Sequence, residues 1–341
     1  MDTWPEIISD EAALDEVQSR PWPQAVDLAS RLDGDVLVLG ATGKVGPTLV
    51  RTVRRALDAA GSRHQVIAVS RHPPESLRGE GIRLVPCDLT DLAAVERLPR
   101  TPHVIFLAGR KFGSSGNEAL TWATNVVVPY HVARTFTGSQ IVAFSTGCVY
   151  PVMDVSTGGA TEATPPEPVG EYSMSCLGRE RMFDYFAQTA GERVLHFRLN
   201  YAVELRYGVL VDVAAKVWAG QPVDVTTGYA NVIWQGDVAN EALLCLPLAA
   251  SPARPLNITG AETIRIRDVA ARFGRLFGRE AIIAGAENGR GYLSNAAAAH
   301  ALFGPPAVSL DRMIGWIAHW VRSGGGTLNK PTHFEVQDGK Y

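Results

Sequence analysis

The chain has 341 residues, enough for two domains or for one α/β domain with an enlarged second lobe. Hydrophobic residues make up 46% of it and charged residues 20%, and the net charge of −3 gives no reason to expect a nucleic-acid partner. The four cysteines lie far apart, with no CxxC pair and no histidines at zinc spacing, so we expect reduced thiols and no metal site. The N-terminus lacks the apolar core of a signal peptide, and no apolar run is long enough to span a bilayer; we expect a cytoplasmic protein that does not bind membranes.

The first 33 residues predict a helical extension that precedes the main fold. Ser9 or Asp10 can cap its helix, and Pro21 would end it. Over residues 34–199, short apolar runs alternate with helical stretches, which is typical of a parallel sheet with helices on both faces. We therefore predict an α/β fold, a doubly wound parallel sheet of the Rossmann type that binds NAD(P). Its strands are expected at residues 35–40, 64–70, 82–88, 103–109, 140–146 and 193–200.

Residues 200–341 have a less regular pattern and predict a smaller α/β lobe that binds the substrate. We expect segments near residues 231–237 and 255–260 to return to the main domain, and we expect Asp237 to cap the helix that follows it. A strand is expected at 256–260, and a strand end precedes the second helix of this lobe. The helices are predicted within residues 206–222, 231–246, 266–277 and 310–326.

A glycine-rich turn, Gly40-Ala41-Thr42-Gly43-Lys44-Val45-Gly46, follows the first expected strand and precedes a helical stretch. Glycine permits positive φ and close backbone approach, and the start of the helix presents free N–H groups to a pyrophosphate. This context favours a dinucleotide-binding turn over a tight turn that binds nothing. After the third expected strand, Asp88 can accept a hydrogen bond from an adenine amino group, or it can cap the helix expected at 91–98.

In this order the motifs resemble the extended short-chain dehydrogenase/reductases, a family that includes sugar-nucleotide epimerases and dehydratases. The similarity covers about residues 35–320, and its further motifs are CDLTD at 87–91, FLAGRKFGSSG at 106–116, Asn125 in TNVVVP, FSTGCVY at 144–150 and EYSMSCLGRE at 171–180. Asn125 matches the family's structural asparagine. For cofactor binding the resemblance implies Gly40, Thr42, Gly43, Lys44, Val45, Gly46, Ser70, Arg71, Asp88, Leu89, Leu107, Ala108, Gly109, Lys111 and Asn125.

The resemblance also implies the catalytic groups. Hydride transfer at a carbinol carbon needs a group that takes or gives the hydroxyl proton and a donor that holds the oxygen. By resemblance Tyr172 is this acid/base, Thr146 is its hydroxyl partner, and Ser145 is a second candidate that contacts the substrate. Without the family order, a buried tyrosine and a threonine at a strand edge would be the simpler interpretation.

Position 176 departs from the family pattern, because Cys176 stands where the family has the lysine of Tyr-x-x-x-Lys. A tyrosine base at pH 7 needs its pKa lowered by about 3 units, and a thiol cannot supply that shift. Three accounts stay open: Arg179 or Lys111 supplies the cation, Tyr172 acts mainly as an acid, or the protein is catalytically impaired. Cys176 itself is either a nucleophile or, more simply, a small packing residue. Cys148 shares a strand face with Thr146 by the period of two, and can line the same pocket.

The end of the second expected strand bears on the choice of cofactor. NAD-specific relatives place a carboxylate there, whereas this chain has Ser70 and Arg71. Arginine is a bidentate phosphate donor, and no carboxylate stands beside it in the sequence, so we prefer NADP over NAD. In the second lobe, the candidate contacts of the substrate are Asn200, Tyr201, Arg206, Trp234 and Gln235.

These observations predict an NAD(P)-dependent oxidoreductase that acts on a hydroxyl or carbonyl of a sugar, sugar acid or nucleotide sugar, within an epimerase or dehydratase cycle or as a dehydrogenase. The alternative is a catalytically impaired NADP-binding sensor or scaffold protein. By resemblance we expect a homodimer formed through helices at 118–136 and 172–188, the first kinked by Pro129.

Overall fold

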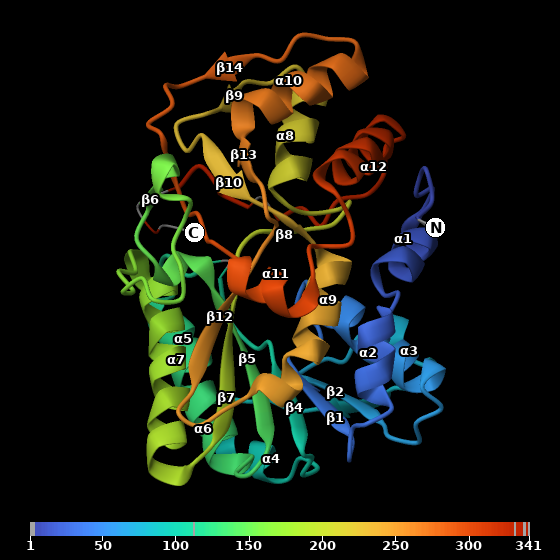
Figure 1. Cartoon of the computed structure of the whole chain (residues 1–341), viewed down its shortest axis with the longest axis vertical. Helices are drawn as coiled ribbons and strands as arrows, with labels where there is room; N and C mark the ends of the chain where they lie inside the picture. Colours follow the sequence, from blue (N-terminus) through green and yellow to red (C-terminus); the bar gives the residue numbers. More distant parts are fainter. Residues whose placement is uncertain (1–3, 112, 331, 337–338, 340–341) are drawn as a thin grey trace.

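The computed structural model describes residues 4–111, 113–330, 332–336 and 339. A seven-stranded sheet forms the lower part of Figure 1, and all of its strand pairs are parallel. The predicted doubly wound sheet is confirmed, and each of the six strands expected between residues 34 and 200 lies within its expected range. In spatial order the strands are β12 (Arg254–Ile258), β7 (Arg193–Leu199), β5 (Gln140–Thr146), β4 (His103–Phe106), β1 (Val36–Leu39), β2 (Val66–Ser70) and β3 (Arg83–Pro86).

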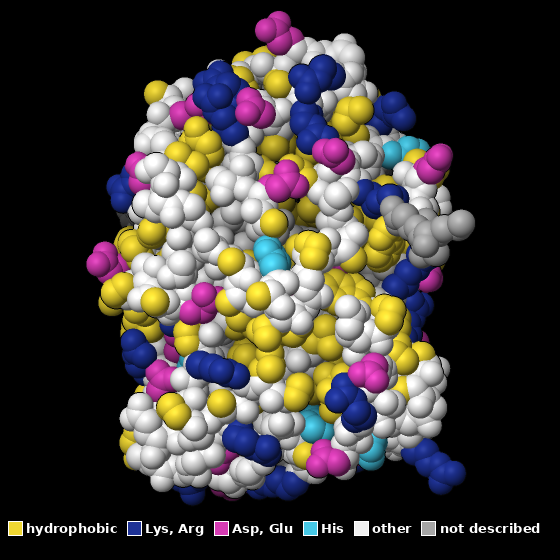
Figure 2. Space-filling model, in the orientation of Figure 1, with side chains coloured by type: hydrophobic (Ala, Val, Ile, Leu, Met, Phe, Trp, Pro, Cys, Tyr) yellow, Lys and Arg dark blue, Asp and Glu magenta, His cyan; other side chains and the backbone are white. Residues whose placement is uncertain are grey.

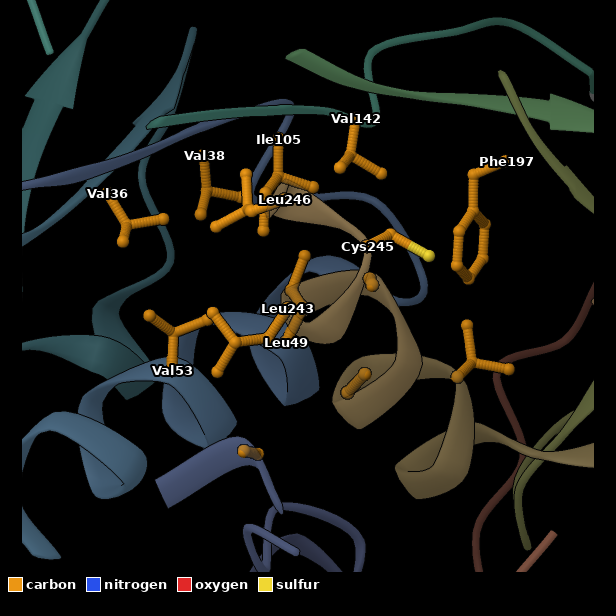
Figure 3. Packing of buried hydrophobic residues seen from close by; sticks show 14 of the residues in the cluster. Val36, Val38, Leu49, Val53, Ile105, Val142, Phe197, Leu243, Cys245 and Leu246 are labelled. Carbon is orange, nitrogen blue, oxygen red and sulfur yellow. The ribbon is translucent and has the colours of Figure 1, made fainter. Parts of the chain in front are cut away.

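Both faces of this sheet are covered, which explains why its strands are apolar without interruption. On β1, Val36 and Val38 pack toward α3 (Gly46–Ala59) and α9 (Gln235–Leu244), as Figure 3 shows. Leu37 and Leu39 of the same strand belong to the opposite layer, which contains residues of α6 (Val128–Thr135) and α7 (Gly170–Ala190). Successive side chains of a strand point to opposite faces, so β1 has no polar side.

The strand order reverses between β1 and β4. Chain connections leave these two neighbouring strands toward opposite faces, so a crevice opens beyond their carboxyl ends, and in doubly wound sheets ligands bind there. The helices α4 (Leu92–Glu96), α5 (Glu118–Trp122) and α6 precede the strand β5, whose end also reaches this edge.

Above this edge lies the second lobe, the upper part of Figure 1, with its own hydrophobic core. The helices α8 (Val209–Trp218), α10 (Ile266–Phe277) and α12 (Leu310–Arg322) confirm three of the predicted helices, and α9 confirms the fourth. The predicted strand at 256–260 is β12, which joins the large sheet beside β7. The remaining strands form four pairs: β8 (Ala202–Val203) with β11 (Ile233–Trp234), β9 (Val223–Asp224) with β14 (Ile283–Ala284), β10 (Tyr229–Asn231) with β13 (Thr263–Arg265), and β6 (Met153–Asp154) with β15 (Arg290–Gly291).

The N-terminal extension forms two helices, α1 (Glu11–Gln18) and α2 (Pro23–Ala29). The expected cap is Asp10, whose carboxylate accepts from the Ala13 N–H at 2.9 Å. The extension is part of the fold and does not merely precede it. The Trp22 N–H donates to the Asn240 side chain of α9, and α2 lies in the core beside α3.

The helical segment before β5 differs from the expected kink at Pro129. Between α5 and α6 the chain makes one π-helical turn, η2 (Ala123–Val127), and Pro129 follows in the first turn of α6. The residues before Pro129 are already helical, so the proline removes a backbone donor inside the helical stretch, directly after the π turn. The irregularity is therefore the π turn that precedes the proline.

The chain after α12 runs back toward the edge of the sheet. Thr332 donates its N–H and its hydroxyl to the Asp212 carboxylate on α8, at 2.8 and 2.6 Å. Gly339 packs against Val169 and Gly170 at the start of α7. Within the described residues no helix has the length and apolarity needed to span a bilayer. Figure 2 shows charged side chains of both signs scattered over the visible face, without a continuous basic stripe.

Candidate active site

The glycine turn lies between β1 and α3, beside the loop that follows β4. Gly40 has a φ of +97°, and a Cβ there would lie 2.5 Å from the Ala108 backbone nitrogen. A Cβ on Gly46 would lie 2.4 Å from the carbonyl oxygen of Ala41. The turn is closed by hydrogen bonds from the Gly43 N–H to Gly40 and from the Gly46 N–H to Gly43. Only glycine fits at these positions, and the backbone is left open to a ligand. Thr42 and Val45 belong to the same turn.

The carboxyl end of β2 is suited to the ribose of a dinucleotide. Ser70 is buried, and its hydroxyl has no hydrogen-bond partner among the described residues. Arg71 is exposed, and its charge is one of the influences that lower the pKa of Asp88, after the hydrogen bonds from Thr90. No carboxylate stands beside Arg71 along the chain, but the sheet brings Asp88 close because β2 and β3 are neighbours.

Asp88 does not cap the next helix. The cap of α4 is Asp91, which accepts from the Ala93 N–H, while Asp88 accepts from the N–H and hydroxyl of Thr90. The Asp88 carboxylate stays exposed at the sheet edge, where it can accept from an adenine. Leu89 next to it is buried, and its carbonyl oxygen is hydrogen-bonded to the His131 ring.

The loop after β4 is held by Asn125 of η2. The Asn125 side chain accepts from the Arg110 N–H at 2.8 Å and donates to the Arg110 carbonyl at 3.0 Å and to the Ser175 hydroxyl at 2.9 Å. The Leu107 N–H continues the β1 ladder by donating to Leu39. Asn125 is fully buried, so it orients this loop. We had expected it to bind the cofactor, but its side chain is bound to Arg110 and Ser175 instead.

Tyr172, at the start of α7, lies close to Thr146, the last residue of β5, and the Thr146 hydroxyl favours the ionised form of Tyr172. Thr146 also accepts from the Cys148 N–H at 3.2 Å, which fixes its hydroxyl at the strand end. Burial raises the pKa of Tyr172 well above its ordinary value, and the thiols of Cys176 and Cys148 add to this. The Tyr172 hydroxyl is therefore protonated at neutral pH, and both groups of the predicted pair meet at the carboxyl edge of the sheet.

Ser145 is not available to a substrate. Its hydroxyl donates to the Glu180 carboxylate, which also accepts two hydrogen bonds from Arg198. Arg198 in turn donates to the Tyr150 hydroxyl, and Tyr150 donates to Asn257. This buried network joins β5, α7, β7 and β12 beneath the site, so the role expected for Ser145 is wrong.

The two cysteines of the site are packing residues. Burial raises the pKa of Cys176 to about 11, so the thiol is neutral and is no nucleophile at physiological pH. Cys148 lies in the 3-10 turn η3 (Gly147–Val149), not on a strand face as expected. Both thiols lie near Tyr172 and help to raise its pKa.

Arg179 holds the frame of the site. Its guanidinium donates to the Phe144 carbonyl at 2.7 Å and to the Asn125 side chain at 2.9 Å. Its carbon Cζ lies 5.5 Å from the centre of the Phe106 ring, and a Cβ on Gly109 would lie 2.4 Å from its Nη2 atom. Arg179 is buried, and its two terminal nitrogens are bound to the protein.

Two lysines follow the carboxyl ends of β1 and β4. The Lys111 Nζ atom lies 5.9 Å from the centre of the Tyr172 ring and donates to the Thr332 carbonyl at 3.3 Å. The Lys44 Nζ atom donates to the Ala202 carbonyl at 2.6 Å and lies 3.8 Å from the centre of the Tyr207 ring. Burial lowers the pKa of Lys44 to about 7.

The surroundings of these two lysines include residues that the sequence did not single out. Tyr207 and Asp212 of the second lobe and Thr332 of the C-terminal segment contact or face the two lysines. The only sequence signal was the acidic and aromatic character of these stretches, which carried no period or motif.

Among the expected substrate contacts, Tyr201 lies near Cys148 and Tyr207. Asn200 is buried and donates to the Tyr292 carbonyl. Arg206 is paired with Glu204 and with Glu11 of the extension.

Trp234, Gln235 and Asp237 take structural roles on and before α9. Trp234 is fully buried against Trp316, and Gln235 donates to Gln18 and Thr48. Asp237 does not cap α9, because it lies inside the helix and accepts from the Val308 N–H. The roles predicted for Arg206 and for these three residues are wrong, since the extension and the helix α12 cover them.

Residues 36–205 match the profile of the NAD dependent epimerase/dehydratase family. The match spans 170 of the 341 residues of the chain. No curated protein sequence matches the chain.

The chain shares its fold with solved structures and covers nearly the whole length of each of them. The UDP-glucose 4-epimerase of Thermus thermophilus with NAD is 21% identical, with a TM-score of 0.68, over 84% of this chain and 99% of that one. The UDP-glucose 4-epimerase of Thermotoga maritima with UDP-glucose is 18% identical, with a TM-score of 0.72, over 85% and 99%. A double mutant of DesIV, a dTDP-glucose 4,6-dehydratase of Streptomyces venezuelae with NAD, is 18% identical, with a TM-score of 0.72, over 84% and 96%.

Proposed function

We propose that this protein is an NAD(P)-dependent enzyme that oxidises a hydroxyl or reduces a carbonyl of a nucleotide sugar, within an epimerase, dehydratase or dehydrogenase reaction. The observation that carries the proposal is the proximity of Tyr172 and Thr146 at the carboxyl edge of a dinucleotide-type sheet. A bound nicotinamide would accept or return a hydride at the carbon of the substrate. Tyr172 takes or gives the proton at the substrate oxygen, and Thr146 holds that oxygen by a hydrogen bond.

The proposed cofactor site uses the glycine turn for the pyrophosphate and the exposed Asp88 for the adenine. The unpartnered Ser70 hydroxyl and the exposed Arg71 favour NADP, because both can donate to a 2′-phosphate. Solved structures of the same fold contain NAD, so NAD is the competing cofactor in the test.

The proposed substrate site lies between the sheet edge and the second lobe. Tyr201, Tyr207 and Asp212 line it from the lobe, and Lys44 and Lys111 line it from the loops after β1 and β4. Two ammonium groups and several hydroxyls suit the diphosphate and the sugar hydroxyls of a nucleotide sugar.

We also propose a homodimer through the helical segment α5–η2–α6 and the helix α7. Large apolar side chains are exposed on these elements, namely Leu120, Val127, Met174 and Tyr185. Exposed apolar patches of this kind mark protein interfaces. Light scattering should give the mass of two chains, and Met174→Glu should give one; a monomeric wild-type protein would contradict this proposal.

The proposal is tested on the purified protein. One sample is denatured, and any released nucleotide is identified by liquid chromatography and mass spectrometry. A second, native sample is assayed with NAD+ or NADP+ and a panel of UDP- and dTDP-sugars. We expect a bound or tightly binding dinucleotide and conversion of at least one sugar. Dinucleotide binding without any conversion would favour the sensor or scaffold, which the missing lysine at position 176 supports. A protein that binds neither cofactor would overturn both.

A further inference from the structure

The N-terminal extension packs into the cores of both lobes. Ile8, Leu14 and Val17 lie in the hydrophobic core of the second lobe. A few residues later, Trp22 and Leu28 lie in the core of the main domain, which contains the seven-stranded sheet, α3 and α9. Figure 1 shows the extension in dark blue along one side of the molecule, with α2 beside α3. The extension therefore spans the junction between the two lobes.

One carboxylate of the extension, that of Asp15 on α1, contacts an arginine of each lobe. One of its oxygens accepts from Arg51 of α3 at 2.8 Å, and the other lies 3.6 Å from the Nη2 atom of Arg206 in the second lobe. The side chains of Asp15, Arg51 and Arg206 are 29%, 10% and 17% exposed, so salt screens these charges less than it screens a surface pair. Asp15 therefore joins the two lobes.

The segment 202–207 of the second lobe contacts the glycine turn of the main domain. The Ala202 carbonyl accepts from the Lys44 Nζ atom at 2.6 Å, and the centre of the Tyr207 ring lies 3.8 Å from the same atom. A turn of this kind is where the pyrophosphate of a dinucleotide binds. Movement of the segment away from the turn breaks both contacts and opens the turn.

Arg206 belongs to this segment and ties it to the extension. Its guanidinium donates to Glu204 within the segment at 3.0 Å and to Glu11 of the extension at 3.1 Å. Glu204 is almost fully buried, so the guanidinium cannot swing away without leaving a charge unpaired in the interior. Arg206 therefore stays with the segment and holds it against the extension.

Arg51 is fixed in the main domain. Its Nε atom donates to Glu80 at 2.9 Å and its Nη2 atom to the Ser76 carbonyl at 2.9 Å, both in the connection between β2 and β3. The helix α3 that carries Arg51 begins at the glycine turn. Since Asp15 contacts this fixed arginine on one side and Arg206 on the other, the segment leaves the turn only if one of these two contacts breaks.

We infer that Asp15 is a positioning residue that holds the segment 202–207 against the glycine turn, and that the N-terminal extension is a clasp that slows the entry and release of the dinucleotide. The part of this inference that concerns the dinucleotide rests on the proposed function. Removing the Asp15 carboxylate leaves two arginines without the negative charge between them, which favours separation of the segment from the turn.

The first test needs no ligand and compares hydrogen exchange in the wild-type protein, Asp15→Ala and Asp27→Ala by mass spectrometry. Asp27 is the matched control, because it lies on α2 of the same extension and its exposed ion pair with Arg31 stays within one helix. Both aspartates lie inside helices, so alanine changes helix propensity equally. Exchange over residues 202–207 should be at least about fivefold faster in Asp15→Ala and unchanged in Asp27→Ala.

Equal exchange of this segment in the three proteins would overturn the inference, whether or not the protein binds a dinucleotide. An increase of the same size in the central strand β5 would indicate a general loss of stability, and it would also overturn the inference. The variant Asp15→Glu keeps a carboxylate between the two arginines and should restore slow exchange.

Release of a dinucleotide gives the second readout, with NADPH or NADH as the fluorescent probe and an excess of the oxidised form to displace it. Release should be at least about fivefold faster in Asp15→Ala than in Asp27→Ala, while the dissociation constant changes less than about twofold, because the clasp opposes entry and release alike. Unchanged release from Asp15→Ala would overturn the inference. Failure of the wild-type protein to bind either probe would contradict the proposed function, and the exchange result alone would then decide whether Asp15 holds the segment.

Discussion

Arg198 and Glu180 form a buried ion pair, 2.6 Å between Nη2 and Oε2, directly beneath the strand that ends in Thr146. Their side chains are 5% and 1% exposed. Burial opposes ionisation of Glu180, but the hydrogen bonds from Arg198 and Ser145, with the charges of His196 and Arg198, together hold the pKa of Glu180 below its ordinary value. The pair also anchors Ser145 and Tyr150, so it fixes the position of β5.

Removing one partner of this pair should destabilise the protein strongly. Arg198→Met leaves the Glu180 carboxylate buried without its main donor, and such losses cost about 3–5 kcal/mol. Chemical denaturation measures the loss. The control is Arg181→Met on α7, the helix of Glu180. The ion pair of Arg181 with Asp184 is more exposed and should contribute less than about 1 kcal/mol. Similar losses for the two variants would show that the buried network does not stabilise the fold.

Gly40→Ala should impair both folding and cofactor binding. A Cβ at Gly40 would lie 2.5 Å from the Ala108 nitrogen, and the φ of +97° is unfavourable for alanine. The control is Gly61→Ala, which has a φ of +65° and open space around it, so it isolates the backbone cost of about 1 kcal/mol. Thermal unfolding and calorimetry with NADP+ measure the two effects. If both variants behaved alike, the contact between the turn and the loop after β4 would not matter.

Asp237 should make stability depend on pH. Burial raises its pKa to about 7, whereas an unfolded aspartate has a pKa of about 3.9. The folded state therefore binds the extra proton between these values, so its contribution to stability is complete below about pH 4 and is lost as the pH rises through about 7. Asp237→Asn keeps an acceptor for the Val308 N–H and cannot ionise.

Urea unfolding at several pH values between about 5 and 8 tests this sign. The free energy of unfolding should fall less steeply with pH in Asp237→Asn than in the wild type. Asp311→Asn, a change of an exposed carboxylate on α12, should leave the slope as it is. Parallel curves for Asp237→Asn and the wild type would contradict the prediction.

Arg71→Ala should weaken the binding of NADP+ by about five- to tenfold and leave that of NAD+ unchanged. The reason is that Arg71 is expected to donate to the 2′-phosphate, which NAD+ lacks. Calorimetry with both dinucleotides gives the ratio of the two affinities. Arg83→Ala is the control, because Arg83 is the first residue of β3, the strand beside β2, and lies away from the strand end that precedes Arg71. An equal loss for NAD+ and NADP+, or no loss, would remove the argument for NADP.

The sheet could be predicted because its signals are local. Val36–Leu39 is apolar at every position since both faces are covered, and the glycine turn follows it directly. The pair of Tyr172 and Thr146 could be predicted because its motifs stand in a familiar order. The order of motifs along the chain is preserved even where single residues, such as Cys176, depart from it.

The substrate side could not be predicted because it depends on contacts between distant parts of the chain. Arg206 is paired with Glu11, 195 residues away, and Lys111 contacts Thr332, 221 residues away. Gln235 is bound by Gln18 of the N-terminal extension. An arginine, a tryptophan or a glutamine beside a returning strand has the same pattern whether it faces a ligand or a docked helix.

The most direct test of the account compares Tyr172→Phe with the wild-type protein, in dinucleotide affinity by calorimetry and in turnover of the nucleotide sugar found by the panel. In Tyr172→Phe the dinucleotide affinity should change by less than about threefold, whereas turnover should fall by at least about a hundredfold. Phenylalanine keeps the ring but has no proton to exchange. Turnover that persists in a folded, cofactor-binding Tyr172→Phe variant would contradict the account.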